Sequence, residues 1–198
     1  MGKLCERAYG RLSKDAGKTM KILMVSKFDY SDFPGGIEMC VKEMMAGLNK
    51  NGIRCDLLCS STNKSYSERD YGDYKIYKTP SYGYKFSTAI TPRLIFKLKE
   101  LADNYDIIHF QHPDPMAAFA ILYSKPKAKI VMHWHSDILK QKKLLKLYKY
   151  FQTKALEISD VILASSPNYA DYSPYLKPFI EKVKVLPIGI SENVNNKD

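Results

Sequence analysis

The chain has 198 residues, of which 45% are hydrophobic and 26% charged, as is usual for one globular domain with its own core. No apolar run approaches the roughly 20 residues of a membrane-spanning helix, and the first 19 residues lack the apolar stretch of a secretory signal. The net charge of +10 indicates a polyanionic neighbour: nucleic acid, an anionic membrane surface or a phosphate-bearing substrate.

The first half of the chain alternates between strand and helix patterns. Residues 21–28 form a continuous apolar run, which is typical of a strand buried on both faces. Residues 37–49 have the apolar spacing of a helix, which Asn51-Gly52 ends. The next predicted elements are a strand at 54–60, a polar loop at 61–72 and a strand at 73–79.

The second half continues this alternation. Its predicted elements, in chain order, are a helix at 92–103, a strand at 106–111, a short helix at 116–123, a strand at 128–135, a long helix at 138–159, and strands at 160–165 and 182–186. Strands separated by helices imply parallel crossover connections. The sequence therefore predicts an α/β fold, a doubly wound parallel sheet with helices on both faces.

Ligands of doubly wound sheets bind at the carboxyl ends of the strands. This rule selects four stretches, namely 29–38, 109–115, 133–137 and 165–168. We expect the glycine pair of the first stretch and the paired histidines of the third to share one rim of the sheet.

The loop after the first strand contains Gly35-Gly36 and opens the first helix. Paired glycines let backbone amides approach a ligand, and a helix N-terminus favours a phosphate or an oxyanion. A plain tight turn is the alternative interpretation. Glu38, in the first helical turn, either contacts a ligand or complements the helix dipole. The G-x-G-x-x-G spacing of dinucleotide-binding proteins is absent.

The four histidines, His109, His112, His133 and His135, lie at two predicted strand ends. A histidine cluster suggests a metal site, but no aspartate or cysteine stands beside them at ligand spacing, so we predict no metal site. A catalytic or substrate-orienting role for one of them is favoured by their place at the ligand edge. A buried structural role is the alternative for His109 and His133.

The predicted helix at 138–159 is strongly basic. Lys142, Lys146 and Lys149 face away from its apolar stripe, so they either form a solvated surface or dock on an anionic membrane. No nucleic-acid-binding motif accompanies the charge, and we expect no nucleic-acid partner. The four cysteines form no C-x-x-C pair, which favours reduced thiols in a cytoplasmic protein.

Five motifs occur in order at 21–25, 35–38, 106–109, 131–137 and 185–190. Together they resemble glycosyltransferase family 4, which has the GT-B fold with two Rossmann-like domains. The resemblance covers residues 20–190 and is greatest to bacterial mannosyl- and rhamnosyl-type transferases of surface-polysaccharide assembly, including lipopolysaccharide. Ile188 and Ser191 depart from the family's usual asparagine and acidic residue near the hinge.

The resemblance implies a retaining, metal-independent enzyme without a cofactor, which uses a nucleotide sugar such as a GDP- or UDP-sugar as co-substrate. His135 matches the family's cleft histidine and is the catalytic candidate, and Gly35 and Gly36 are expected near the donor phosphates. The remaining candidates, for acceptor or sugar contacts, are Glu38, His112, Ser136 and Asp137.

The expected organisation has three parts: a leader at 1–19, an acceptor-side domain at 20–190, and the start of an interdomain linker at 191–198. The donor domain is expected beyond the chain, so the chain alone is predicted to be inactive. The expected reaction adds a mannose-like sugar to a lipid-linked or surface-polysaccharide acceptor at the inner face of the cytoplasmic membrane. The alternative is a stand-alone Rossmann-like module that binds an anionic ligand without catalysis.

Overall fold

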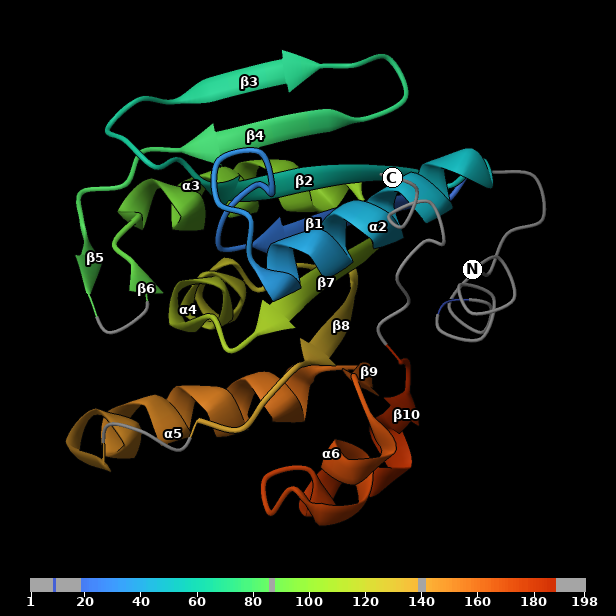
Figure 1. Cartoon of the computed structure of the whole chain (residues 1–198), viewed down its shortest axis with the longest axis vertical. Helices are drawn as coiled ribbons and strands as arrows, with labels where there is room; N and C mark the ends of the chain where they lie inside the picture. Colours follow the sequence, from blue (N-terminus) through green and yellow to red (C-terminus); the bar gives the residue numbers. More distant parts are fainter. Residues whose placement is uncertain (1–8, 10–18, 86–87, 139–141, 188–198) are drawn as a thin grey trace, which may run out of the picture.

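An eight-stranded sheet forms the centre of the computed structural model, which describes residues 9, 19–85, 88–138 and 142–187 (Figure 1). Its strands, in chain order, are β1 (Lys21–Ser26), β2 (Arg54–Ser60), β3 (Ser67–Asp70), β4 (Lys75–Thr79), β7 (Ile107–His112), β8 (Lys129–Trp134), β9 (Val161–Ala164) and β10 (Val183–Val185). They lie in the order β10-β9-β8-β7-β1-β2-β4-β3, and every neighbouring pair is parallel except β3 with β4. The short strands β5 (Tyr84–Lys85) and β6 (Thr88–Ala89) pair separately.

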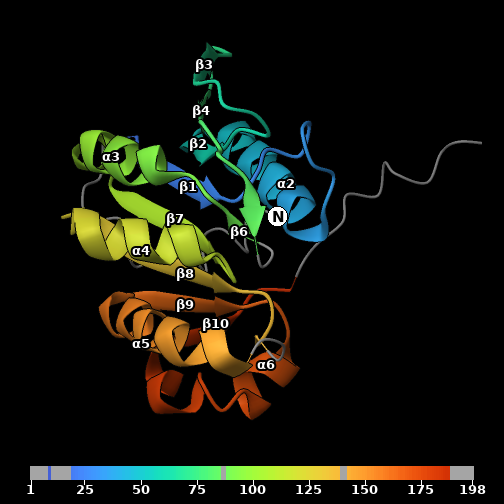
Figure 2. The same ribbon diagram turned by 90° about the vertical axis from the view of Figure 1, so that its left-hand side faces the viewer.

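Helices cover both faces of the sheet (Figure 2). One face is covered by α2 (Gly36–Lys50), and the other by α3 (Pro92–Leu101), α4 (Pro115–Ser124) and α5 (Lys142–Ile158). The remaining elements are the 3₁₀ turns η1 (Ala102–Asn104) and η2 (Lys177–Lys182) and the short helix α6 (Pro167–Tyr172). This arrangement confirms the predicted Rossmann-like parallel sheet.

Two cores lie on the two faces because the side chains of a strand alternate. On β7, Ile108 and Phe110 pack with α3, α4 and α5, while Ile107 packs on the side of α2. The same alternation puts His109 and Gln111 on the α2 face and His112 on the opposite face. Both faces of the central strands are therefore buried, which explains their unbroken apolar runs.

Most predicted helices and strands are confirmed, with ends shifted by a few residues. The loop predicted over 61–72 is wrong, because it contains β3, which pairs antiparallel with β4. This edge strand is mainly exposed and charged, so it has no apolar pattern to reveal it. The helix predicted from 138 is described from Lys142 onward, and Ile138 itself is not helical.

The predicted leader and linker fall almost entirely outside the described residues. Of residues 1–19, the structure describes Tyr9 and Thr19, and residues 191–198 are outside it. Tyr9 is 1% exposed and packs its ring edge against His109, with 5.8 Å between ring centroids. One side chain of this segment thus belongs to the core on the α2 face.

Candidate functional site

The carboxyl ends of β1, β7, β8 and β9 meet at one edge of the sheet, because these strands are parallel neighbours. In the strand register, Val25 lies beside Phe110, and Trp134 lies between His112 and Ala164. The loops that follow these strands contain the candidate residues of the four predicted stretches. They form the rim at which a doubly wound sheet binds ligands.

Helix α2 brings its first turns directly against the histidine loop. Ligand atoms of Cys40 in α2 and of His133 and His135 all lie within 4.8 Å of one another. Cys40 follows Gly36 by about one helical turn. The glycine pair and the paired histidines therefore share one rim, as the sequence predicted.

Gly35 and Gly36 begin α2, but a side chain would meet a close neighbour at only one of them. Gly35 is the N-cap, in an extended conformation with φ −107° and ψ 168°, and its lack of a side chain leaves room for Glu38. A Cβ on Gly35 would overlap Oε2 of Glu38, whereas a Cβ on Gly36 would meet nothing within 4 Å. The N-cap residue makes no side-chain hydrogen bond to the helix start, and the Glu38 carboxylate accepts from its own amide, so the amides before Glu38 favour an anion.

Glu38 is a buried carboxylate at the start of α2, with 6% of its surface exposed. Burial is the largest influence and raises the pKa of Glu38; a hydrogen bond from its own backbone amide and the charge of Lys27 oppose this effect, and Asp114 adds to it. Asp114 caps α4 by accepting hydrogen bonds from the amides of Met116 and Ala117, at 3.1 and 3.3 Å. The loops after β1 and β7 are thus electrostatically coupled through two carboxylates.

The loop before the glycine pair is tied to β4 by one lysine. Nζ of Lys78 lies 2.8 Å from Oδ2 of Asp29 and 2.9 Å from Oδ2 of Asp32. The Lys78 side chain is 12% exposed, so this ion pair is partly shielded from solvent. This ion pair holds residues 29–32 against β4, just before α2 begins.

His135 directly follows β8 and is 9% exposed. Its Nε2 lies 2.8 Å from Oε1 of Gln111, whose own Nε2 donates to Sδ of Met24 at 3.6 Å. Burial lowers the pKa of His135 to about 4, so the ring is neutral near pH 7. When Nε2–H donates to Gln111, Nδ1 keeps a lone pair. Gln111 was missed from the sequence, although it shares the strand face of His109.

His112 lies on the other face of the sheet and does not join His135. Its ring stacks on Trp134, with 3.8 Å between centroids and 5° between planes, and it also lies near the ring of Tyr148. Burial, assisted by the charge of His135, lowers the pKa of His112 to about 3. His112 is 1% exposed, so its ring is not accessible for the acceptor contact predicted from the sequence.

Ser136 and Asp137 follow His135 but differ in their contacts. Asp137 Oδ1 accepts hydrogen bonds from Nε1 of Trp134, at 2.9 Å, and from Oγ of Ser173, at 2.8 Å. These bonds hold the loop after β8 against Trp134 and against the residue that follows α6. Ser136 is partly exposed beside His135.

The three lysines predicted to face a membrane lie on α5. Lys149 is exposed. The side chains of Lys142 and Lys146 lie outside the part of the chain that the structure describes.

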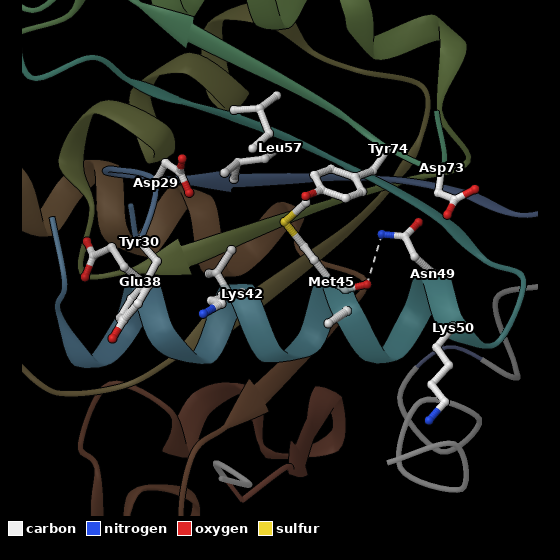
Figure 3. Close-up of a pocket in the computed structure, with 13 residues that line it drawn as sticks. Asp29, Tyr30, Glu38, Lys42, Met45, Asn49, Lys50, Leu57, Asp73 and Tyr74 are labelled. Carbon is white, nitrogen blue, oxygen red and sulfur yellow. Dashed lines mark hydrogen bonds between the residues drawn. The ribbon is translucent and has the colours of Figure 1, made fainter. Parts of the chain in front are cut away.

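A groove of about 400 Å³ runs along α2 from this rim (Figure 3). Asp29 and Glu38 border one end, and Asn49 and Lys50 border the other. Its walls come from α2 and from the neighbouring β2 and β4. The buried carboxylate of Glu38 thus belongs to both the rim and the groove.

Comparison with known proteins gives matches over most of the chain. A family model described as Glycosyltransferase Family 4 matches residues 34–194. The chain is 34% identical over 174 residues to O-antigen chain mannosyltransferase C of Escherichia coli, covering 88% of this chain and 47% of that protein. It is 26% identical to D-rhamnosyltransferase WbpZ of Pseudomonas aeruginosa, covering 88% and 46% of the two chains.

Solved structures agree with the fold. Anabaena HepE in complex with UDP-glucose aligns with a TM-score of 0.58 at 18% identity, over 86% of this chain and 44% of that one. A sucrose-phosphate synthase of Thermosynechococcus elongatus aligns with a TM-score of 0.55 at 14% identity, over 86% and 90% of the two chains. The chain spans about half the length of the curated relatives that it matches.

Proposed function

The chain belongs to glycosyltransferase family 4, and from this premise we propose that it supplies the acceptor-side half of a retaining, nucleotide-sugar-dependent transferase. The enzyme adds a mannose-like sugar to a lipid-linked or surface-polysaccharide acceptor. Two relatives named as an O-antigen mannosyltransferase and a D-rhamnosyltransferase support this substrate class.

The shared rim of α2 and the histidine loop is the observation that carries this proposal. Transfer from a nucleotide sugar requires stabilisation of the departing diphosphate and of the positive charge that develops at the sugar carbon. The uncapped N-terminus of α2, at Gly35 and Gly36, suits the diphosphate. His135, neutral and at the same rim, suits the transferred sugar.

The acceptor is assigned to the groove along α2. Glu38 offers a carboxylate that accepts hydrogen bonds from sugar hydroxyls, and the nearby ammonium of Lys42 lies 4.7 Å from the centre of the Tyr30 ring. An aromatic ring beside charged and amide groups suits a sugar chain, which has apolar faces and hydroxyl edges.

A second domain completes the active site in this proposal, since the chain spans about half of its curated relatives. Closure of two domains keeps water away from the activated sugar. The test compares the 198-residue chain with the enzyme that contains it, using a panel of GDP- and UDP-sugars and linkage analysis of the product. We expect turnover by the enzyme and none by the chain. Efficient transfer by the chain alone would contradict the half-enzyme assignment.

An exposed aromatic ridge supports a position at the inner face of the cytoplasmic membrane. Among the described residues, no helix combines the length and apolarity needed to cross a bilayer. Adjacent rings of α3, α4 and α5, with centroids 5.6 to 6.4 Å apart, instead form a surface ridge made of Phe96, Phe119, Tyr123, Tyr150 and Phe151. Exposed Arg93, Lys99 and Lys149 lie on the same helices. Aromatic rings flanked by cations suit an anionic lipid surface.

Sedimentation with lipid vesicles tests this position. We expect the chain to bind vesicles that contain phosphatidylglycerol and to bind neutral vesicles weakly. The double change Phe96→Ser and Tyr150→Ser removes two rings that are 62% and 61% exposed and should weaken binding severalfold. Tyr172→Ser, at a ring that is 77% exposed on α6, is the control. Equal losses in both variants would contradict a role of the ridge.

A further inference from the structure

A cluster of three metal-ligating side chains lies beneath the rim, on the α2 face of the sheet. Cys40 comes from α2, and His133 and His135 come from the end of β8. One ligand atom of each lies within 4.8 Å of those of the other two. All three side chains are buried, with 4%, 1% and 9% of their surfaces exposed.

Three of the four ring nitrogens in this cluster are buried without a hydrogen-bond partner in the part of the chain that the structure describes. Neither ring nitrogen of His133 has a hydrogen-bond partner among the described residues, and the same is true of Nδ1 of His135. Nearly all buried polar atoms of folded proteins have a partner, so unpartnered nitrogens call for one. The two rings lie 4.1 Å apart between centroids and are inclined by 29°, so coordination of one shared cation requires a rotation of the rings from this stacked arrangement.

The surroundings fit a soft cation. Sδ of Met44 lies 3.9 Å from Sγ of Cys40, which adds a second sulfur to the neighbourhood. The contact of 2.8 Å between Gln111 and Nε2 of His135 fixes that ring and leaves Nδ1 for a ligand, as an outer hydrogen bond does for metal-bound histidines. One thiolate and two imidazoles without a carboxylate suit Zn²⁺ and not Mg²⁺ or Mn²⁺.

We propose that Cys40, His133 and His135 form a binding site for one thiophilic cation, with Zn²⁺ as the fitting ion. Binding replaces the S–H bond of Cys40 by a sulfur–metal bond, and the proton leaves to solvent. The two imidazoles coordinate as neutral ligands, and an exchangeable water or anion completes a tetrahedral set.

Titration of the full 198-residue chain tests the site. After removal of metals by a chelator, Co²⁺ serves as the spectroscopic probe and Zn²⁺ and Mg²⁺ as competitors. We expect one equivalent of Co²⁺ to produce thiolate-to-cobalt charge-transfer absorption, which Zn²⁺ abolishes and Mg²⁺ does not. Cys40→Ala should weaken binding at least about tenfold, whereas the matched change Cys59→Ala, at another buried cysteine on β2, should not. Equal affinities of the two variants would overturn the proposal.

Ligand counting on the wild-type chain keeps the test independent of variants that fail to fold. X-ray absorption of the zinc-loaded chain should give one sulfur and two imidazole nitrogens around the metal. A shell without sulfur would overturn the proposal. A shell with one sulfur and two imidazoles would support it.

A consequence for catalysis rests on the proposed function of His135. Nδ1 of His135 is buried, so a cation bound to it would lock the ring in this orientation and block any turn toward a sugar at the rim; zinc should therefore inhibit the enzyme that contains this chain. Inhibition, expressed against each protein's own zinc-free rate, should fall at least about tenfold in Cys40→Ala. A zinc-loaded enzyme with an undiminished rate would refute this consequence, and the ligand count would still decide the site. A failure of the proposed transfer reaction would be recognised separately, as absent turnover without zinc.

Discussion

The two faces of β7 and β8 differ sharply although they are built from alternate residues of the same two strands. On the α2 face, His109, Gln111, His133 and His135 form a buried polar layer, in which Nε2 of His135 contacts Oε1 of Gln111. On the α4 and α5 face, His112, whose ring nitrogens also have no hydrogen-bond partner among the described residues, is stacked on Trp134 inside an aromatic and aliphatic core. Under the proposed function, the α2 face supplies the reactive groups and the α4 and α5 face supplies stability, so alternate residues of one buried strand serve two purposes.

The largest expected effect is a loss of folding stability caused by a change on the α4 and α5 face. Trp134 is fully buried, and Trp134→Ala should lower the free energy of unfolding by about 3–5 kcal/mol, because it leaves a cavity beside His112. Urea unfolding of the chain measures this change. Trp134→Phe is the matched control: it keeps an aromatic ring, loses part of the ring volume and the hydrogen bond to the Asp137 carboxylate, a bond worth about 1.5–3 kcal/mol, and should cost less than Trp134→Ala. A loss below about 1 kcal/mol for Trp134→Ala would refute the division between the faces.

The next largest effect is a loss of activity caused by a change on the α2 face. His135→Ala in the enzyme that contains this chain should lower kcat/KM by about 10²- to 10³-fold, because it removes a positioned polar group from the rim. Steady-state kinetics with the best nucleotide sugar measure this loss, with circular dichroism as the check of folding. His112→Ala, at the residue stacked on the other face, should instead reduce stability more than kcat/KM. An unchanged rate in His135→Ala would remove this histidine from the mechanism.

A smaller effect sharpens the comparison at the start of α2. Gly35→Ala should lower the free energy of unfolding by about 1 kcal/mol, because the added methyl meets the flexible end of the Glu38 side chain and makes its buried carboxylate shift. Gly36→Ala meets open space and should change stability by less than about 0.5 kcal/mol. Thermal or urea unfolding of the two variants tests this difference. Equal effects would mean that Glu38 does not require the space above Gly35.

The smallest expected effect concerns the ion pair that anchors this loop. Burial raises the pKa of Asp29, but hydrogen bonds from Lys78 and Ser31 and the charge of Lys78 outweigh it, and the pKa is lowered from 3.8. A carboxyl with a lowered pKa stabilises the folded state above its unfolded pKa, and this contribution is lost as pH falls through the folded pKa. Since the pair is partly exposed, it is worth at most about 1 kcal/mol.

The comparison of wild type with Asp29→Asn measures that contribution. Urea unfolding should give a gap of at most about 1 kcal/mol near neutral pH, and the gap should close at a pH well below the folded pKa. A gap that stays constant over this range would assign the stabilisation to packing and not to charge.

Much of the fold could be predicted from the sequence, because buried parallel strands leave continuous apolar runs. Residues 54–60, for example, were predicted as a strand with the bounds that β2 has in the structure. Strand β3 could not be predicted, since an exposed edge strand pairs through its backbone and needs no apolar side chains.

The candidate site was only partly predictable. The position of Gly36 and His135 at one rim followed from their places after β1 and β8. The approach of Cys40 to His133 could not be predicted, because these residues are far apart in the sequence and the approach of α2 to the end of β8 depends on tertiary packing. The contact between His135 and Gln111 joins neighbouring strands, and their register was likewise not encoded in local spacing.

The charged edge strand β3 has a consequence for self-association. Its Glu68, Arg69 and Asp70 are exposed. Nζ of Lys75, in β4, lies 3.0 Å from Oδ2 of Asp70. An open edge that presented apolar residues would offer a template on which a second chain could extend the sheet and begin aggregation. The dense charge along β3 opposes such pairing by repulsion and hydration, so this end of the molecule is protected against assembly into continuous β-structure.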